Sequence, residues 1–196
     1  MMNDTNRSTR KAADSDELAL LARVSSGDRK AFADLYRRFH PRLYGYLLRM
    51  LPNIVMVDEA LDDVMLVVWK DARKFRGRSS VSTWIFGIAY HKALSSMRAE
   101  RRYQGPLDRV TDEASLPVSV APDDNLLSTA LSRLSFDHRQ VVELTYFGGY
   151  SYREIAEIAN CPVNTVKTRM FHAKRRLRVL LPKLATPSTE KKHDLP

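Results

Sequence analysis

The sequence predicts an all-α protein made of two small helical domains joined by an acidic flexible linker. Apolar residues recur at helical spacing on both sides of residues 103–125. Glycine is scarce, with 7 in 196 residues, which favours helices. Residues 103–125 hold three prolines and five acidic residues against one arginine, without periodicity. So long an aperiodic segment favours a domain boundary, and a disordered excursion within one domain is the alternative.

The first domain is expected over residues 15–102. Residues 1–14 are polar and aperiodic, and we expect them to be disordered. Ser15 can cap a short first helix. Residues 26–28 (Ser-Gly-Asp) are expected to end this helix and to provide the N-cap of the next helix. Pro41 is expected to end or kink this second helix, because proline lacks the amide hydrogen that the helix needs.

The segment 57–72 combines an apolar side with an acidic side. Its acidic residues are spaced so that they share one face of a helix: Asp58, Glu59, Asp62 and Asp63. Such a stripe is most often a solvated face. The functional alternative is a docking surface for a basic protein, since complementary charge orients a partner and speeds its association.

A basic loop and a long helix follow the acidic segment. Residues 70–78 contain five Lys+Arg and one Asp, and Ser79 or Ser80 can cap a helix that runs to about residue 102. On this helix Phe86 and Tyr90 are i, i+4 neighbours outside the apolar stripe. Aromatic rings among cations suit single-stranded nucleic acid, because unpaired bases stack on rings. Burial in a helical core is the alternative for both residues.

The second domain, residues 126–182, contains the order of elements found in a helix-turn-helix. Ser151 and Glu154 match a capping box, and Asn160 tolerates the left-handed backbone of a tight turn. The last helix follows, and residues 163–181 hold six Lys+Arg and no acid. This pattern indicates a helix that enters the DNA major groove, and a basic surface helix of a bundle is the alternative. Residues 183–196 are expected to form a flexible tail.

Composition excludes several classes of protein. A single cysteine cannot form an intramolecular disulfide or a Cys-rich zinc site. No Gly-rich phosphate loop, H-E-x-x-H or G-x-S-x-G motif is present, so we expect no enzyme, catalytic residue, cofactor or metal. No apolar run approaches the ~20 residues of a membrane span, and no signal-peptide core is present, so we expect a cytoplasmic protein. The net charge of +9 favours a polyanionic partner.

With these segments in order, the chain resembles the extracytoplasmic-function (ECF) group of the bacterial sigma-70 family. In the first half the resemblance rests on GDRKAFADLYRRFHPRLYGYLLRML, DEALDDVMLVVW and KFRGRSSVSTWIFGIAYHKAL. In the second half it rests on LSFDHRQVVELTYFGGYSYREIAEIANCPVNTVKTRMFHAKRRLR. It covers nearly everything from about Glu17 to Leu181, and it implies a region 2-like first domain and a region 4-like second domain.

The resemblance implies a sigma factor that binds core RNA polymerase and directs it to promoters, under the control of an anti-sigma factor. The first domain would recognise the −10 element as a melted single strand, and the second the −35 element as a duplex. The acidic helix would dock on the polymerase. The alternative is a stand-alone helix-turn-helix regulator, which would bind symmetric DNA sites as a dimer without polymerase.

Three sets of contact residues follow from the resemblance. The −35 set is Asn164, Thr165, Lys167, Thr168, Arg169, Phe171, His172 and Arg175. The −10 set is Phe75, Arg76, Arg78, Ser79, Ser80, Phe86, Tyr90 and His91. The polymerase set is Leu61, Asp62 and Asp63. Within the −35 set, Lys167, Thr168, Phe171 and His172 would face the bases, and Asn164, Thr165 and Arg169 the backbone.

Overall fold

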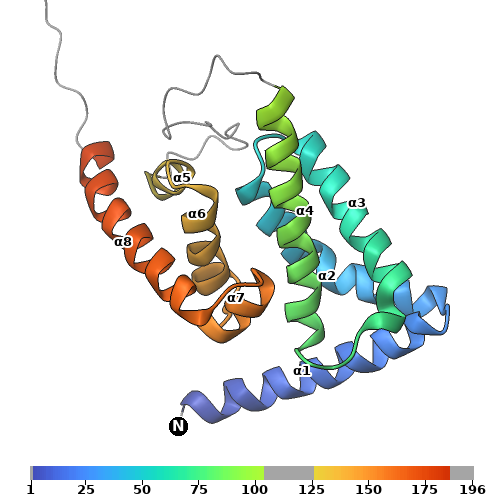
Figure 1. Ribbon diagram of the computed structural model, residues 1–196. Coiled ribbons are helices and arrows are strands. Elements are labelled where there is room, and N and C mark those ends of the chain that lie inside the picture. Colours follow the sequence, from blue (N-terminus) through green and yellow to red (C-terminus); the bar gives the residue numbers. More distant parts are fainter. Residues whose placement is uncertain (1, 104–125, 186–196) are drawn as a thin grey trace, which may run out of the picture.

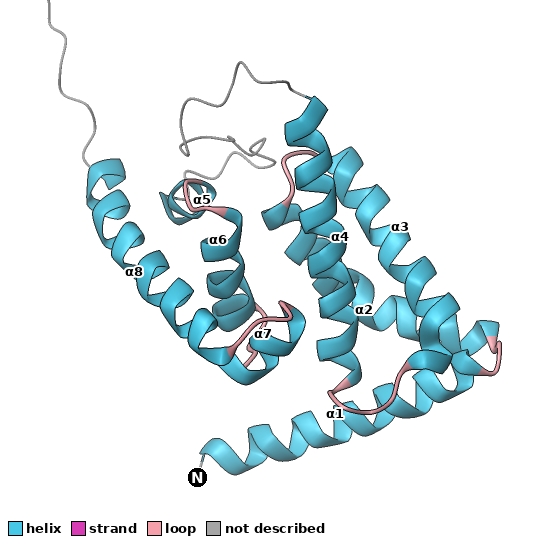
Figure 2. Ribbon diagram, in the orientation of Figure 1, coloured by secondary structure: helices cyan, strands magenta, loops and turns pink. Residues whose placement is uncertain are grey.

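The computed structural model describes residues 2–103 and 126–185 of the chain, and these residues form helices and connecting turns without a strand (Figure 2). The all-α prediction is therefore confirmed. The acidic linker predicted over 103–125 lies outside the described residues except for Tyr103, and so does the tail from residue 186 onward.

The first domain contains four α-helices and one short 3-10 helix. They are α1 (Met2–Ser25), α2 (Arg29–Met50), α3 (Ile54–Asp71), η1 (Ala72–Lys74) and α4 (Val81–Tyr103). Helices α2, α3 and α4 pack side by side, and α1 runs across the end of this bundle where η1 leads into α4 (Figure 1). The core lies between the apolar stripes that the sequence predicts, with Leu35, Phe39, Val64 and Ile85 fully buried.

Two features of the first domain differ from the sequence predictions. Helix α1 begins at Met2, so the segment expected to be disordered before Ser15 is helical up to that residue. No glycine or proline interrupts residues 2–25, and nothing in the covalent chain stops the helix from continuing toward the N-terminus.

The second difference concerns Pro41, which lies inside one continuous helix, α2, and does not end it. Proline removes the hydrogen bond to the carbonyl of Arg37, but both residues are exposed, so water can satisfy that carbonyl. The buried stripe of α2 continues past Pro41 with Leu43 and Leu47, and this packing holds the helix together.

The second domain contains four α-helices and one π-helical turn. They are α5 (Leu126–Ser132), α6 (Phe136–Val142), the π turn η3 (Glu143–Phe147), α7 (Tyr152–Ile158) and α8 (Val163–Ala185). The predicted capping box of Ser151 and Glu154 begins α7, and Asn160 adopts a φ of 47° in the turn to α8. Helices α7 and α8 are the predicted helix-turn-helix, and buried Ile155, Val166 and Met170 contribute to its core.

The two domains pack against each other. Helix α4 lies against α7, and α2 lies against α6, so that apolar residues of both domains form one continuous cluster (Figure 1). This contact decides which of the predicted site residues are exposed.

Candidate nucleic-acid interface

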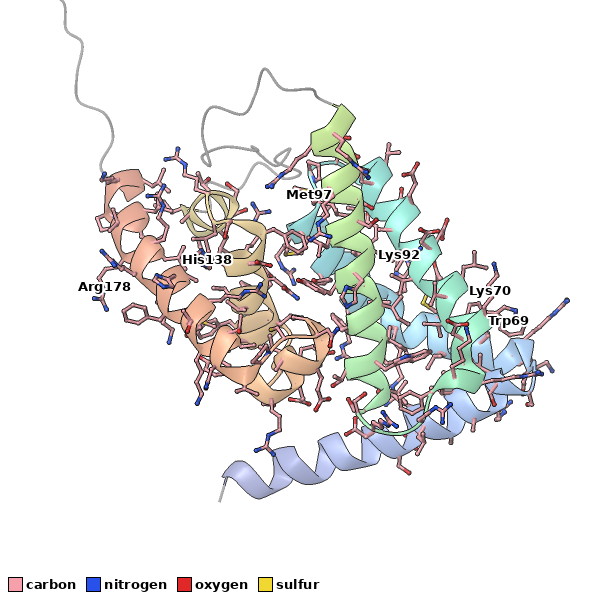
Figure 3. The ribbon with its side chains drawn as sticks, viewed as in Figure 1. Trp69, Lys70, Lys92, Met97, His138 and Arg178 are labelled. Carbon is pink, nitrogen blue, oxygen red and sulfur yellow. The ribbon has the colours of Figure 1, made fainter. Side chains whose placement is uncertain are left out.

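Helix α8 presents most of the predicted −35 residues on one exposed surface. The exposed members of the set are Asn164, Lys167, Thr168, Phe171, His172 and Arg175. The Phe171 side chain is 64% exposed, and the Thr168 hydroxyl donates a hydrogen bond to the carbonyl of Asn164 at 3.0 Å. Arg178 extends from the outer side of α8, away from the other helices (Figure 3). Cations, hydroxyls and an exposed ring on one helix face can contact phosphates, base edges and a thymine methyl.

Arg169 does not belong to this exposed surface. Its guanidinium pairs with the Asp137 carboxylate of α6 at 2.7 Å, and its side chain is largely covered. The prediction that Arg169 reaches the DNA backbone is not supported by this geometry, because the charge is already used to join α6 to α8. Thr165 is half-buried at the start of α8.

A pair of histidines lies beside the −35 surface. The rings of His138 in α6 and His172 in α8 stack with centroids 6.0 Å apart, and His138 lies between the two helices (Figure 3). Burial lowers the pKa of His138, and the neighbouring His172 lowers it further. His138 is therefore favoured in its neutral form, and it supports the position of the His172 ring.

The predicted −10 loop, residues 75–80, is held at both ends and exposed in the middle. The Phe75 ring packs against Trp84 with centroids 5.4 Å apart, and Gly77 adopts a φ of 67°, which favours glycine. Ser80 caps α4 by accepting a hydrogen bond from the Thr83 amide at 3.0 Å, as one of the two predicted serines should. Arg76 and Arg78 are exposed, and Ser79 is half-buried.

Phe86 and Tyr90 do not form an exposed platform in this structure. They are 3% and 4% exposed, which agrees with the alternative that their rings are core residues. Part of the cover comes from the second domain: the ring centroids of Phe86 and Tyr150 are 5.2 Å apart, and those of Tyr90 and Phe136 are 5.8 Å apart. Sequence periodicity could not find this cover, because it arises between residues far apart in the chain.

Two adjoining grooves run along α4. The first, of ≈ 580 Å³, is lined by Ser79, Thr83 and His91 from the first domain and by Glu157 from α7. The second, of ≈ 550 Å³, continues from His91 along Arg98, Arg101 and Arg102. The predicted −10 residues Ser79 and His91 thus lie on a path whose far end is strongly basic, as a nucleic-acid backbone requires.

The predicted polymerase set on α3 divides into exposed acidic residues and one buried leucine. Asp62 is exposed, and Asp63 accepts a hydrogen bond at 2.8 Å from Lys92 of α4, which points toward α3 (Figure 3). Leu61, however, is 3% exposed and belongs to the core, so the prediction that it contacts the polymerase directly is wrong for this structure. Leu66, one turn after Asp62, is exposed instead. Its position outside the predicted apolar stripe is the sequence signal for this exposure.

Two further kinds of site were searched for among the described residues. Within 2–103 and 126–185, no group of three or more His, Cys, Asp or Glu side chains could hold a metal ion. No helix of the described part of the chain is long and apolar enough to cross a membrane.

Comparisons with known proteins agree with both halves of the chain. Residues 35–103 match the family model for sigma-70 region 2, and residues 124–177 match the model for sigma-70, region 4. The ECF RNA polymerase sigma factor RpoE of Cereibacter sphaeroides is 32% identical over 178 residues, which span 87% of this chain and 97% of that protein. The ECF RNA polymerase sigma factor SigK of Mycobacterium bovis is 31% identical over 173 residues, spanning 84% and 92%.

A solved structure has the same fold. The sigma factor RpoE of Bartonella quintana, in complex with the anti-sigma factor NepR, matches with a TM-score of 0.64 and 26% identity. The match covers 78% of this chain and 98% of that one.

Proposed function

The chain belongs to the ECF sigma factors of the sigma-70 family, and from this premise we propose how its residues share the recognition of a promoter. Sigma factors bind core RNA polymerase and direct it to promoters, and they are initiation factors without catalytic chemistry of their own. The observation that carries the assignment of residues is the combination, on one chain, of an exposed basic helix-turn-helix face and a basic loop that leads into a groove.

The exposed face of α8 recognises the −35 element as a duplex. Lys167, Thr168, Phe171 and His172 face the base edges of the major groove, while Asn164 and Arg175 approach phosphates. Each good contact with a base edge contributes about 1–3 kcal/mol of discrimination against the wrong base pair. Arg169 acts indirectly, because its ion pair with Asp137 fixes the orientation of α8.

The 75–80 loop and the two grooves of α4 take the melted −10 strand. Arg76 and Arg78 hold the strand at the loop, and His91 stands where a base can enter the first groove. Arg98, Arg101 and Arg102 continue the path for the sugar-phosphate backbone. Phe86 and Tyr90 can contribute stacking surfaces only when the second domain moves away from them.

The exposed acidic face of α3 docks on the polymerase. Asp62 supplies the exposed charge, Asp63 adds a charge shared with Lys92, and exposed Leu66 extends the face along the helix. Charged residues around an exposed apolar side chain are common at the edge of a protein interface.

An anti-sigma factor controls the protein. The Bartonella quintana relative is held by such a factor in its solved structure, and it shares the fold of this chain. We place the protein in the cytoplasm on the nucleoid, since both partners of a sigma factor, polymerase and promoter DNA, are found there.

Run-off transcription with core polymerase on a genomic promoter library tests the proposed function. We expect transcripts whose start sites share a −10 and a −35 element, and no specific transcript when the protein is omitted. A stand-alone regulator would instead bind tightly to symmetric duplex sites without polymerase and would add no new start sites to core polymerase.

A further inference from the structure

An exposed stripe of α8 continues the −35 surface toward the C-terminal end of the helix. Lys167, Phe171, Lys174 and Arg178 follow one another at steps of three or four residues, so they share one side of the helix. All of them are exposed, and the Arg178 side chain points away from the other helices (Figure 3). Lys167 and Phe171 belong to the proposed −35 set, whereas Lys174 and Arg178 have no role in it.

The two cations at the end of this stripe are not neutralised within the protein. In the part of the chain that the structure describes, neither Lys174 nor Arg178 forms an ion pair, whereas the guanidinium of Arg169 pairs with Asp137 at 2.7 Å. Like charges four residues apart on a helix repel each other and lower its stability. An anionic partner that binds at Lys174 and Arg178 relieves this repulsion.

An exposed tyrosine borders the stripe at Lys174. Tyr146 lies in the π turn η3 and is 62% exposed, although Leu144 of the same turn is buried. The Lys174 ammonium lies over the Tyr146 ring, 5.9 Å from its centroid. The Tyr146 hydroxyl makes no hydrogen bond to any residue that the structure describes. The ring therefore supports the lysine through a cation–π contact, and the free hydroxyl adds a hydrogen-bond donor beside the charge.

The turn that holds Tyr146 has an uncommon geometry. The Gly148 amide donates to the carbonyl of Glu143 at 2.9 Å, five residues earlier. A Cβ atom at Gly148 would lie 2.8 Å from the carbonyl oxygen of Leu144, so only glycine fits at the end of this turn. Turns of the π type are rare and are frequently found at functional sites. Here the turn brings the Tyr146 ring against the exposed stripe of α8.

A DNA duplex in contact with the −35 surface brings phosphates to the same stripe. From Lys167 to Arg178 the helix rises about 16 Å, and each DNA strand carries one negative charge per roughly 3.4 Å of its axis. Lysine, arginine and tyrosine side chains are common phosphate ligands, and such contacts position a protein on DNA without reading its sequence. Continuity with the −35 surface favours duplex DNA over an acidic protein as the partner.

We propose that Tyr146, Lys174 and Arg178 form a backbone ridge, a surface that binds the sugar-phosphate strand of duplex DNA beside the groove that α8 enters. Lys174 and Arg178 pair with phosphates, and the Tyr146 hydroxyl donates a hydrogen bond to a phosphate oxygen. The ridge fixes the register of α8 in the groove and contributes affinity that is independent of sequence. This inference rests on the proposed function, because it extends the −35 surface to a second part of the same duplex.

The salt dependence of DNA binding by the full-length chain tests the backbone ridge. We measure the binding of a fluorescein-labelled duplex of random sequence by anisotropy over a range of KCl concentrations, because phosphate contacts do not depend on sequence. Lys174→Ala with Arg178→Ala should weaken binding. It should also make the plot of log affinity against log salt concentration less steep by about 1.8, since each lost phosphate contact changes this slope by about 0.9.

A second double variant is the matched control for charge. Arg176→Ala with Lys183→Ala removes the same number of charges from exposed positions of α8. Arg176 is turned by about 200° from Arg178 around the helix, and Lys183 lies near its far end. The control should change the slope much less. Equal slopes for the two double variants, with both chains folded by circular dichroism, overturn the backbone ridge.

The contribution of Tyr146 is measured in the same titration. Tyr146→Phe keeps the ring and loses the hydroxyl, so it should weaken binding roughly twofold to tenfold and leave the slope unchanged. Tyr146→Ala also removes the support of Lys174 and should weaken binding further. Unchanged affinity in Tyr146→Phe overturns the assigned hydrogen bond to phosphate.

Run-off transcription with core polymerase separates the backbone ridge from the proposed function. Lys174→Ala with Arg178→Ala should reduce transcription by a similar factor from promoters with different −35 sequences, because phosphate contacts do not read bases. Reduced transcription without any change in binding to the random duplex would assign the stripe to an acidic protein partner and overturn the ridge. Absence of promoter-specific transcription by the unaltered chain contradicts the proposed function itself, whereas the salt slope still decides whether the ridge binds phosphates.

Discussion

The two helices that we propose to contact DNA, α8 and α4, differ in what covers them. The predicted base-contacting side chains of α8 are exposed, with Phe171 at 64%, whereas Phe86 and Tyr90 of α4 lie under the second domain at 3% and 4%. Both helices are 23 residues long and carry basic residues in their last turns, and both have aromatic residues that the sequence analysis placed outside the predicted core stripe. The difference therefore comes from tertiary packing and not from local sequence.

The contrast has a physical origin in the two kinds of target. A duplex is recognised by polar tips and cations, which can remain in water until DNA arrives. A single strand is held by stacking on aromatic rings. Large apolar patches formed by such rings favour association or aggregation when they are exposed to water. In this structure the second domain contributes to the cover over Phe86 and Tyr90.

The largest expected effect is the difference in stability between the variants at covered Phe86 and at exposed Phe171. Phe86→Ala should lower the free energy of unfolding by about 3–5 kcal/mol, because the ring is buried between Tyr46 and Tyr150. Phe171→Ala should change it by no more than about 0.5 kcal/mol and should reduce −35-dependent transcription. Urea unfolding followed by circular dichroism checks both. Equal stability losses in the two variants would contradict the claim that Phe86 is buried and Phe171 is exposed.

The next effect concerns duplex recognition by α8. Lys167→Ala with Thr168→Ala should reduce transcription from −35-dependent promoters roughly 30-fold or more, since two contacts are lost and each costs about 1–3 kcal/mol. Affinity for core polymerase should be unchanged in a pull-down assay. Lys183→Ala, near the far end of α8, is the control. Loss of polymerase binding in the double variant would show that the helix-turn-helix has been misassigned.

Arg169 gives an intermediate case, because it lies on the DNA-facing helix but is covered. Arg169→Ala should destabilise the protein by about 1–2 kcal/mol through loss of its ion pair with Asp137. Asp137→Asn should produce a comparable loss without removing any group from α8. Both are measured by urea unfolding. A normal stability of Arg169→Ala combined with weak −35 recognition would return this arginine to the DNA-contacting set.

A smaller effect is expected on the acidic face of α3. Asp62→Asn should weaken binding to core polymerase roughly twofold to fivefold, as an exposed ion pair contributes about 0.2–1 kcal/mol. Asp63→Asn should weaken it less, because Lys92 already neutralises part of that charge. Fluorescence titration with labelled core polymerase measures both. No change even in the double Asp62→Ala and Asp63→Ala variant would exclude this face as the docking surface.

The smallest expected effect is a dependence of the protein's stability on pH, caused by His138. Its folded-state pKa lies below the ordinary 6.5, chiefly through burial and then His172, whereas nearby Asp137 opposes the shift and Arg169 adds to it. The unfolded chain therefore binds more protons, and stability should fall as pH decreases from 6.5 through the folded-state pKa. Thermal unfolding between about pH 7.5 and 5.5 should show a slope that His138→Gln reduces. An identical slope of stability against pH in this variant would show that a group other than His138 causes the dependence.

Sequence reasoning predicted local features well. The capping box at Ser151 and Glu154, the left-handed turn at Asn160 and the Ser80 cap are all present. Each depends on residues within a few positions of one another, so the covalent chain contains the whole signal. The exposed face of α8 follows for the same reason, because helical spacing alone separates Val166 and Met170 from the polar residues.

Features that depend on contacts between distant segments were not predicted. Leu61 is buried and Arg169 is paired because of neighbours on other helices, and neither neighbour can be identified from spacing. The helix through Pro41 persists because its buried face outweighs one lost hydrogen bond. Gly87 is the clearest missed signal: a glycine in the middle of a helix often marks a close approach of another backbone.

The distance between the two domains tests the central claim most directly. Spin labels at Ala33→Cys in α2 and Lys183→Cys in α8, both exposed, in a Cys161→Ala background, report this distance by double electron–electron resonance. The free protein should give one narrow distance distribution, and binding to core polymerase and promoter DNA should shift it to a longer distance. A distribution that does not change on binding, or that is already broad and long in the free protein, would contradict the covered −10 surface.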